Sequence, residues 1–321
     1  MPPRFRFVET NGVRIRVATE GSGPLVVFVH GFPESWYSWR HQIGPVAAAG
    51  FTVCAIDLRG YGGSDKPYAI EAYDMETVVG DIVGVIAALS ADQEAIMVGH
   101  DWGAPLAWSA ALAYPQRVRA VAGLSVPYMG APPAPFIDFI TEEFTNKGRF
   151  FYQAYFQEIG PAEAELEADV RTSLRRFFYS LSGDAPEGAW PVDKAHGDTL
   201  LPGMTDPERF PDWLTPGDED YYVAEFSRSG FRGPLNSYRN HRRNYQWESR
   251  MKDKVLSQPS LFICGTRDIV LKMFPFDPIA LMTSLMPDLR GVHLLEGCGH
   301  WTQQERPHEV TARLLDWLAR I

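Results

Sequence analysis

The stretch VGHDWGA, residues 98–104, decides the fold of this chain. Residues 95–98 form an apolar run of strand length, and residues 104–114 are rich in Ala, Leu and Trp, as expected of a buried helix. The order is therefore strand, sharp turn and helix, with Asp101 at the apex. One glycine stands two residues before Asp101 and another two residues after it, so that strand and helix can approach closely around a strained residue.

An aspartate at the apex of such a turn predicts particular chemistry. Serine usually occupies this place, and its hydroxyl attacks a carbonyl to give an acyl ester. A carboxylate attacks a saturated carbon instead and gives an alkyl ester. Asp101 taken alone is also a good N-cap for the helix that follows. The flanking glycines and the loops described below favour the nucleophile.

Composition excludes several classes of protein. The 321 residues are 45% hydrophobic and 22% charged, which suits a soluble globular protein with a large core. The net charge is −10 and basic clusters are absent, which argues against a nucleic-acid partner and favours a small neutral one. Three cysteines without metal-ligand spacing predict reduced core thiols. The sequence has no signal-like start and no membrane-length apolar run, so we expect a cytoplasmic protein.

Strand-like and helix-like segments alternate through the first 130 residues. Asn11-Gly12 separates two alternating runs and predicts a two-residue hairpin. The expected strands are residues 4–8, 13–18, 25–29, 51–56, 95–98 and 118–124. The expected helices are residues 39–49, 75–90 and 104–114. This alternation predicts an α/β fold with a mostly parallel sheet and helices on both faces.

The alternating pattern of strand-like and helix-like segments stops after residue 130 and resumes at residue 251. Residues 131–250 are rich in aromatic, acidic, Pro and Gly residues and lack an apolar strand run, so we expect an inserted, mostly helical cap domain. The core domain, residues 1–130, resumes at residues 251–321. That second part contains two short strands, at 260–264 and 292–295, and an amphipathic closing helix at 309–321.

The loops after the last two expected strands supply partners for Asp101. Asp268 follows the first and His300 the second, and the carboxyl ends of neighbouring parallel strands converge on one crevice. The order nucleophile, acid, histidine predicts that Asp268 orients His300 as a base. Taken singly, each is an ordinary turn residue. We expect the other candidate histidines to lie at the surface: His41, His196, His241 and His308.

The loop after the third strand predicts an oxyanion site. It reads HGFP, residues 30–33, and its position suits backbone donors. The N–H of Phe32 and that of Trp102 would face the carbonyl oxygen of an ester formed on Asp101. Ordinary turn chemistry also explains the glycine and proline of this loop.

Four motifs carry a family resemblance: FPESWY (32–37), DLRGYG (57–62), GHDWG (99–103) and GCGHW (297–301). They resemble the α/β-hydrolase-fold epoxide hydrolases of the soluble, bacterial type, over nearly the entire chain. The resemblance implies a detoxifying hydrolase with the α/β-hydrolase fold, a helical cap and no metal or organic cofactor. Residues 183–220 match no family pattern.

The resemblance also implies two proton donors in the cap. FYQAYFQE (151–158) and GFRGPLNSYRN (230–240) are similar to the two family segments that each carry a ring-opening tyrosine. The match assigns Tyr152 and Tyr238, with Tyr155 as the alternative to the first. A phenol with a pKa of about 10 is a suitable donor to an alkoxide.

The implied reaction converts an epoxide and water to a vicinal diol through an ester on Asp101, which water activated by His300 then hydrolyses. A haloalkane or haloacid dehalogenase of the same fold and a non-catalytic binding protein of this fold are the alternatives. A serine esterase is disfavoured because no Gly-x-Ser-x-Gly motif occurs. Trp36, Gln153 and Trp301 are candidates for lining the pocket. The sequence leaves open which epoxide is used, the regio- and enantioselectivity, and whether the chain forms a homodimer.

Overall fold

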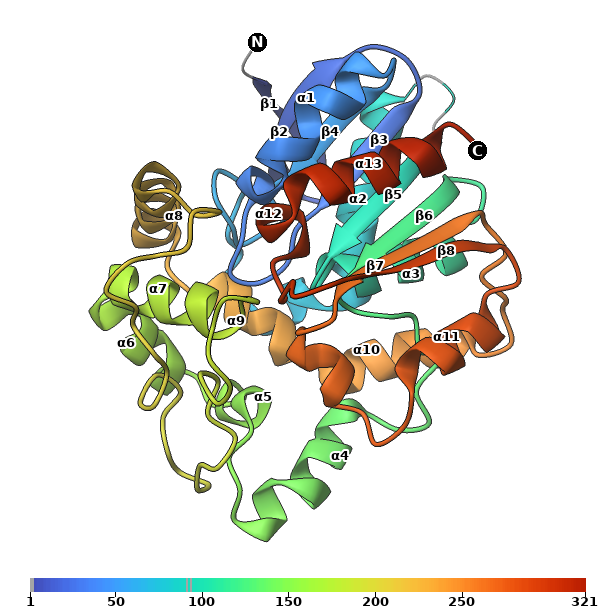
Figure 1. Ribbon diagram of the computed structural model, residues 1–321. Coiled ribbons are helices and arrows are strands. Elements are labelled where there is room, and N and C mark those ends of the chain that lie inside the picture. Colours follow the sequence, from blue (N-terminus) through green and yellow to red (C-terminus); the bar gives the residue numbers. More distant parts are fainter. Residues whose placement is uncertain (1–2, 91, 93) are drawn as a thin grey trace.

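One sheet organises the molecule. The computed structural model describes residues 3–90, 92 and 94–321. Within them, eight strands form a sheet in the order β1-β2-β4-β3-β5-β6-β7-β8 (Figure 1). The strands are β1 (Arg4–Thr10), β2 (Val13–Gly21), β3 (Leu25–Val29), β4 (Thr52–Ile56), β5 (Ala95–His100), β6 (Val118–Leu124), β7 (Ser260–Gly265) and β8 (Leu289–Leu295). Strand β2 pairs antiparallel with β1 and β4, and the other pairs are parallel, which confirms the predicted fold class.

The central strands are covered on both faces. All five residues of β3 are buried, as expected for a continuous apolar run in a parallel sheet. Val26 and Phe28 point to a cluster with helices α1 (Arg40–Ala48) and α13 (Pro307–Leu318), whereas Val27 joins the cluster that contains α2 (Met75–Leu89) and α3 (Gly103–Ala113). Figure 1 shows α13 crossing one face of the sheet. Because successive side chains of a strand point to opposite faces of the sheet, each central strand packs against both helix layers.

One end of the sheet agrees with the sequence expectation, and the other differs from it in detail. The hairpin between β1 and β2 turns at Asn11 and Gly12, whose φ values are 48° and 76°, as the predicted two-residue turn requires. Strand β8 begins at Leu289 rather than residue 292, because Leu289 pairs with Ser260 of β7. Strand β8 has a polar residue and a glycine near its start, so a search for apolar runs misses its first part.

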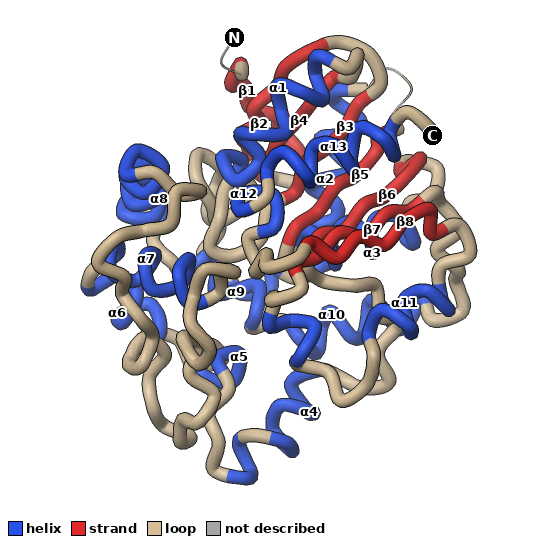
Figure 2. Tube along the Cα trace, in the orientation of Figure 1, coloured by secondary structure: helices blue, strands red, loops and turns tan. Residues whose placement is uncertain are grey.

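A helical insertion separates β6 from β7. It comprises α4 (Phe136–Glu143), η3 (Thr145–Lys147), α5 (Tyr152–Tyr155), α6 (Pro161–Ala168), α7 (Val170–Ser180), α8 (Pro216–Ser229), α9 (Arg232–Tyr238), α10 (His241–Glu248) and η4 (Ser249–Met251). The connection between α7 and α8 runs mainly through turns and loops (Figure 2). Figure 1 shows α5 to α9 grouped beyond the sheet on the side of the strand ends.

The remaining short elements follow strands or link helices. They are η1 (Trp36–Trp39), η2 (Ile70–Tyr73), η5 (Ile269–Lys272), α11 (Pro278–Leu285) and α12 (Thr302–Glu305). Across the described part of the chain, no helix combines the length and the apolar character that crossing a bilayer requires.

Ion pairs join the inserted helix α8 to strand β2 and to helix α1. Arg16 on β2 contacts Glu225 on α8 with 2.5 Å between Nη2 and Oε2. Arg40 at the start of α1 contacts Asp218 on the same helix, with 2.9 Å between Nε and Oδ1. All four side chains are at most 15% exposed, so solvent screens these pairs less than it screens surface pairs. Helix α8 is thereby fixed against the first part of the sheet.

Candidate active site

Asp101 lies in a strained turn between β5 and α3. Its φ is 51°, a left-handed value that costs a non-glycine residue on the order of 1–3 kcal/mol. The glycines around it permit a very close approach of strand to helix. A Cβ on Gly99 would lie 2.0 Å from the carbonyl oxygen of Gly103, and a Cβ on Gly103 would lie 2.1 Å from that of Val29. Glycine is therefore required at both positions, as the spacing predicts.

Three loops bring Asp101, Asp268 and His300 together. Nε2 of His300 lies 3.4 Å from Oδ2 of Asp101. Its Nδ1 lies 3.1 Å from Oδ2 of Asp268. The Asp268 side chain is fully buried and that of His300 is 4% exposed, whereas that of Asp101 is 17% exposed. The carboxylate of Asp101 is thus the member of this group that a ligand reaches most easily.

Charges in this group perturb one another. Burial raises the pKa of the Asp101 carboxyl, but hydrogen bonding and attraction from His300 outweigh it and hold that pKa below its usual value. Asp268 shows the same balance, with a lowered pKa. Burial lowers the pKa of His300, but Asp268 and Asp101 outweigh it and raise that pKa well above its ordinary value. The ion-paired form, two carboxylates around an imidazolium, is therefore favoured.

The loop after β3 reaches the same carboxylate. The backbone N–H of Phe32 donates to Oδ1 of Asp101 at 2.7 Å. This is the oxygen opposite to the one facing His300, so the two oxygens of Asp101 have different partners. Trp102 follows Asp101 directly, and the role of its N–H stays a prediction.

Two tyrosines of the inserted helices face this group. Tyr152 begins α5 and Tyr238 ends α9, and their ring centroids are 5.9 Å apart. The Tyr238 ring packs edge-on against Trp102 and Phe32, at 5.2 Å and 5.5 Å. Burial raises the pKa of both phenols, and the negative charge of Asp101 raises each further. Both hydroxyl groups therefore keep their protons at neutral pH.

Comparison with known proteins identifies the family. Residues 24–307 match the model of the α/β hydrolase fold family. Epoxide hydrolase A of Mycobacterium tuberculosis is 45% identical, with 99% of this chain and 98% of the relative aligned. The chain belongs to the α/β-hydrolase-fold epoxide hydrolases.

Solved structures support this membership. The crystal structure of epoxide hydrolase A from Mycobacterium thermoresistibile is 44% identical and superposes with a TM-score of 0.92, covering 99% of this chain and 98% of that chain. An epoxide hydrolase from an endophytic Streptomyces is 43% identical with a TM-score of 0.94, covering 99% and 96%. Both alignments include the inserted helices as well as the sheet.

The structure separates the three candidate lining residues of this epoxide hydrolase. Gln153 donates from Nε2 to the hydroxyl oxygen of Tyr152 at 2.8 Å. The Trp301 ring lies edge-on to His300 at 4.9 Å, and its indole N–H donates to the carbonyl of Phe178 at 2.7 Å. Both therefore contact site residues directly.

Trp36 lies elsewhere. Its indole N–H donates to the hydroxyl of Tyr221 on α8 at 2.6 Å, and its ring packs against Phe5 of β1. Among the described residues, its ring contacts and hydrogen bonds do not include Asp101, Asp268 or His300. The turn of η1 directs this side chain toward the α8 interface.

His241 departs from the sequence expectation, and the alternative Tyr155 lies apart from Tyr238. His241 is buried, contrary to the predicted surface position, because α10 packs against α4, where its ring lies 6.0 Å from that of Phe136. His41, His196 and His308 are exposed as expected. Tyr155 packs beside Phe150, and its phenol pKa is raised by burial and by Glu165. It therefore does not pair with Tyr238 as Tyr152 does.

Sequence reasoning missed a buried network behind the site. Glu34 is fully buried and accepts from the N–H of Gly31 at 3.0 Å and from the side-chain amides of Gln303 and Gln304 at 2.9 Å and 3.1 Å. Nδ1 of His100 lies 2.8 Å from the same carboxylate, and its Nε2 lies 2.7 Å from the carbonyl of His300. The ring of His100 therefore links the Glu34 carboxylate to the main chain of His300. Glu34 and His100 stand inside two of the sequence motifs, which was the available signal.

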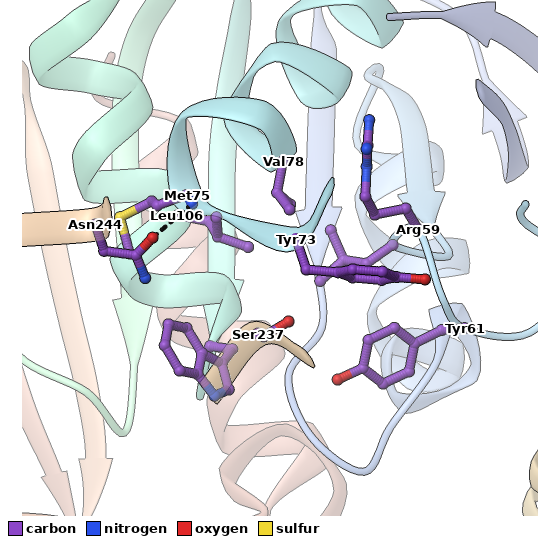
Figure 3. Close-up of a pocket in the computed structure, with 10 residues that line it drawn as sticks. Arg59, Tyr61, Tyr73, Met75, Val78, Leu106, Ser237 and Asn244 are labelled. Atoms are coloured by element: carbon purple, nitrogen blue, oxygen red, sulfur yellow. Dashed lines mark hydrogen bonds between the residues drawn. The ribbon is translucent and has the colours of Figure 1, made fainter. Parts of the chain in front are cut away.

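A small cavity lies beside Trp102 (Figure 3). It is lined by Leu58, Arg59, Tyr61, Tyr73, Met75, Val78, Trp102, Leu106, Ser237 and Asn244. Its free volume of about 20 Å³ exceeds the roughly 10–15 Å³ that a water molecule requires. Tyr61 and Ser237 turn hydroxyl groups into this region, whereas the Asn244 amide oxygen accepts from the N–H of Met75 at 2.8 Å. The cavity holds a single water more readily than part of a ligand.

Proposed function

We propose that this chain hydrolyses epoxides to vicinal diols through a covalent ester on Asp101. One arrangement carries the proposal. The carboxylate of Asp101 lies within 3.4 Å of the His300 imidazole, and two buried phenols with raised pKa values face it from the inserted helices. Family membership supports the same reaction, since the relatives described above are epoxide hydrolases. Residues 131–250 then act as a cap that holds the phenols over the nucleophile.

The first step forms the ester. The lowered pKa of Asp101 keeps it a carboxylate, which is the nucleophilic form. One oxygen of Asp101 bonds to an epoxide carbon while the bond from that carbon to the ring oxygen breaks. Tyr152 and Tyr238 hold that oxygen, and one phenol transfers its proton to it. The products are a hydroxyalkyl ester and a tyrosinate. The second tyrosine stabilises the tyrosinate by donating a hydrogen bond to it.

The second step hydrolyses the ester. Esterification removes the negative charge of Asp101 and its hydrogen bond, two of the influences that raise the pKa of His300. The imidazolium therefore gives its proton to the tyrosinate left by the first step, which restores the phenol and frees His300 as a base. His300 then takes a proton from water, whose oxygen attacks the ester carbonyl. The N–H of Phe32, already directed at Oδ1 of Asp101, stabilises the oxyanion together with that of Trp102.

Collapse of this intermediate closes the proton balance. The bond from the carbonyl carbon to the alkyl oxygen breaks, and His300 returns its proton to the leaving oxygen to give the diol. The carboxyl group of Asp101 then gives its proton to His300, which restores the carboxylate and the imidazolium of the free enzyme. One epoxide and one water have then become one diol.

An isotope experiment tests this route. In a single turnover of an aryl epoxide such as styrene oxide in heavy-oxygen water, the label is expected in the Asp101 carboxyl group. The first diol is expected to carry none, because its new oxygen comes from Asp101. Label in the diol with an unlabelled Asp101 peptide would show direct attack by water and would overturn the ester. A 1-haloalkane serves as a control, and halide release faster than epoxide turnover would favour the dehalogenase instead.

We also propose that the protein works in the cytoplasm. Cys54, Cys264 and Cys298 are free thiols buried in the core. Unpaired cysteines in this number are typical of a reducing compartment. Fractionation of the native host, with immunodetection of the chain, tests the assignment.

A further inference from the structure

The connection between α7 and α8 begins against the loop that carries His300. The N–H of His300 donates to the carbonyl of Leu181 at 2.9 Å. Cys298 and Gly299, just before His300, lie directly against Gly183 of the connection. The start of the connection therefore contacts the main chain of the candidate base through Leu181. Gly183, the first residue of the segment 183–220 that matches no family pattern, contacts the residues just before that base.

Glu305 ties the two stretches together. Glu305 is only 5% exposed. Its carboxylate accepts hydrogen bonds from three backbone N–H groups. They belong to Gly183 of the connection at 2.8 Å, and to Gly299 and Trp301 of the histidine loop at 2.9 Å and 3.0 Å. Gly299 and Trp301 are the neighbours of His300 on either side. One carboxylate thus fixes the backbone before and after the base and joins it to the inserted helices.

The main chains touch where Glu305 holds them. A Cβ on Gly183 would lie 2.1 Å from the carbonyl oxygen of Gly297, and one on Gly299 would lie 2.2 Å from the N atom of Gly183. Real Cβ atoms do not approach other atoms this closely, so both contacts require glycine. The fit between the two stretches is therefore built into the sequence on both sides.

The loop that carries Asp268 joins the same contact. Arg267 donates through Nη1 to the carbonyl of Gly183 and through Nη2 to that of Ala185 at 2.7 Å. Its backbone N–H donates to the carbonyl of Cys298 at 2.9 Å. The connection at residues 181–185 consequently contacts the loops of both members of the Asp268–His300 pair.

We propose that Glu305 is a positioning residue for His300. Glu305 and residues 181–185 together form a clamp that is needed for the hydrolysis of the ester and not for its formation. The inference depends on the proposed function, because it assigns Glu305 to the second step of that route. In that step His300 must hold water in line with the ester carbonyl, and a displacement of about 1 Å at such a group costs roughly 100-fold in rate. The first step makes no such demand on His300, since Asp101 and the phenols perform it.

The charge state of Glu305 sets the conditions for a test. Burial raises its pKa to about 7, while the three N–H donors lower it and Asp184 raises it slightly. The other charged groups at this contact are Arg267, which binds the connection, and Arg306, which donates to the main-chain carbonyl of Glu305. At about pH 8 the carboxylate form predominates. Kinetics at that pH therefore compare the charged clamp with a neutral replacement.

The main experiment is a single turnover of styrene oxide by Glu305→Gln at about pH 8, followed by rapid quenching and intact-mass detection of the ester. The amide retains the shape of Glu305 but directs two N–H donors at groups that themselves donate. We expect ester formation within about twofold of the native rate and ester hydrolysis slowed about tenfold to 100-fold, so that the ester accumulates. Hydrolysis within about twofold of native would overturn the proposal.

Glu165→Gln is the matched control. Glu165 also holds the connection between α7 and α8, by accepting from the N–H groups of Leu200 and Leu201 at 2.9 Å each. We expect both rates to stay within about twofold of native. If this variant slows hydrolysis as much as Glu305→Gln, the effect belongs to the stability of the connection and the proposal fails.

Arg267→Met keeps the proposal testable if Glu305→Gln does not fold. Arg267 is exposed, so its replacement leaves the core intact, yet it removes both hydrogen bonds from the side chain to the connection. We expect hydrolysis about two- to fivefold slower with ester formation unchanged. Unchanged hydrolysis would overturn the clamp. Failure of the native chain to form any ester would overturn the proposed function instead.

Discussion

The two sides of the candidate site are held in place by different means. Asp101, Asp268 and His300 stand at the ends of strands β5, β7 and β8, whose spacing and register the sheet fixes. Tyr152 and Tyr238 stand on short helices, and their separation depends on how those helices pack. A side-chain amide on Gln157 connects the two helices by donating to the carbonyls of Gln153 and Tyr238, each at 2.7 Å. The sheet side is set mainly by strand pairing, with Glu305 and residues 181–185 holding the histidine loop, and the cap side is set by a few side-chain contacts.

This difference corresponds to a division of labour in the proposed reaction. The strand-end groups form and hydrolyse the ester, whereas the cap phenols act on the oxygen released as the ester forms. Variants of the cap phenols should therefore slow ester formation alone, whereas variants on the strand side should affect ester formation or ester hydrolysis, according to the residue replaced. The predictions that follow test that division, beginning with the largest expected change in rate.

Replacing strand-end residues should have the largest effect. Asp101→Asn is expected to abolish ester formation, because the amide is a poor nucleophile, with a loss of roughly 10⁴-fold or more in turnover. His300→Gln should form the ester at close to the native rate but hydrolyse it roughly 10³-fold more slowly, as the general base is lost. Intact-mass spectrometry after mixing with styrene oxide distinguishes the two. Absence of an adduct in His300→Gln would break the comparison on this side.

Replacing the cap phenols should slow only the first step. Tyr152→Phe and Tyr238→Phe each remove one donor and are expected to reduce ester formation by roughly 10- to 100-fold, and the double variant by roughly 10²–10⁴-fold. No ester should accumulate, because hydrolysis stays fast relative to its formation. Pre-steady-state quenching measures both steps. Accumulated ester in either single variant would mean that the phenols also serve the second step, and the division between the sides would fail.

The two steps should also differ in their dependence on pH. Hydrolysis requires neutral His300, and Asp268 keeps the pKa of that group raised after Asp101 is esterified. The hydrolysis rate should therefore fall as the pH drops through this pKa, by about tenfold per unit below it. Ester formation should change little between about pH 6 and pH 9, because the pKa of Asp101 is lowered and those of both phenols are raised.

Asp268→Asn provides the check on that assignment. Without the carboxylate, the acid limb of hydrolysis should move to lower pH, while the maximal rate falls because the ring loses its orientation. Single-turnover profiles of the native chain and the variant measure this shift. An acid limb that stays in place would assign it to a group other than His300.

Much of the sheet side could be predicted from the sequence because strand order and loop position are written in local patterns. The carboxyl ends of parallel strands lie at one edge of a sheet, and this rule alone predicts that Asp101, between glycines, lies near His300, after the last strand. Local sequence patterns do not indicate the hydrogen-bond partners of buried polar groups. Glu34 and Glu305 acquire their roles from hydrogen bonds to residues far along the chain, which hydrophobic periodicity does not encode.

The cap side was open to prediction only through family resemblance. Tyr152 and Tyr155 are three residues apart on one short helix, and their sequence surroundings do not distinguish them. The distinction comes from packing, since Tyr152 lies near Tyr238 and Tyr155 lies against Phe150. Residues 183–220 were unassigned for the same reason, because their contact with the histidine loop uses main-chain groups and glycine rather than a recognisable motif.

The smallest expected effects separate two tryptophans that the sequence treats alike. Trp36→Phe removes a hydrogen bond to Tyr221 at the α8 interface, which should lower the free energy of unfolding by about 1 kcal/mol and leave both rates unchanged. Trp301→Phe removes a bond to Phe178 beside the His300 ring and should slow ester hydrolysis about two- to fivefold. Urea unfolding and single-turnover kinetics measure both. Because the two changes delete the same indole N–H, a rate effect of Trp36→Phe would mean that the α8 interface also positions the site, in addition to the contact of α7 with the histidine loop.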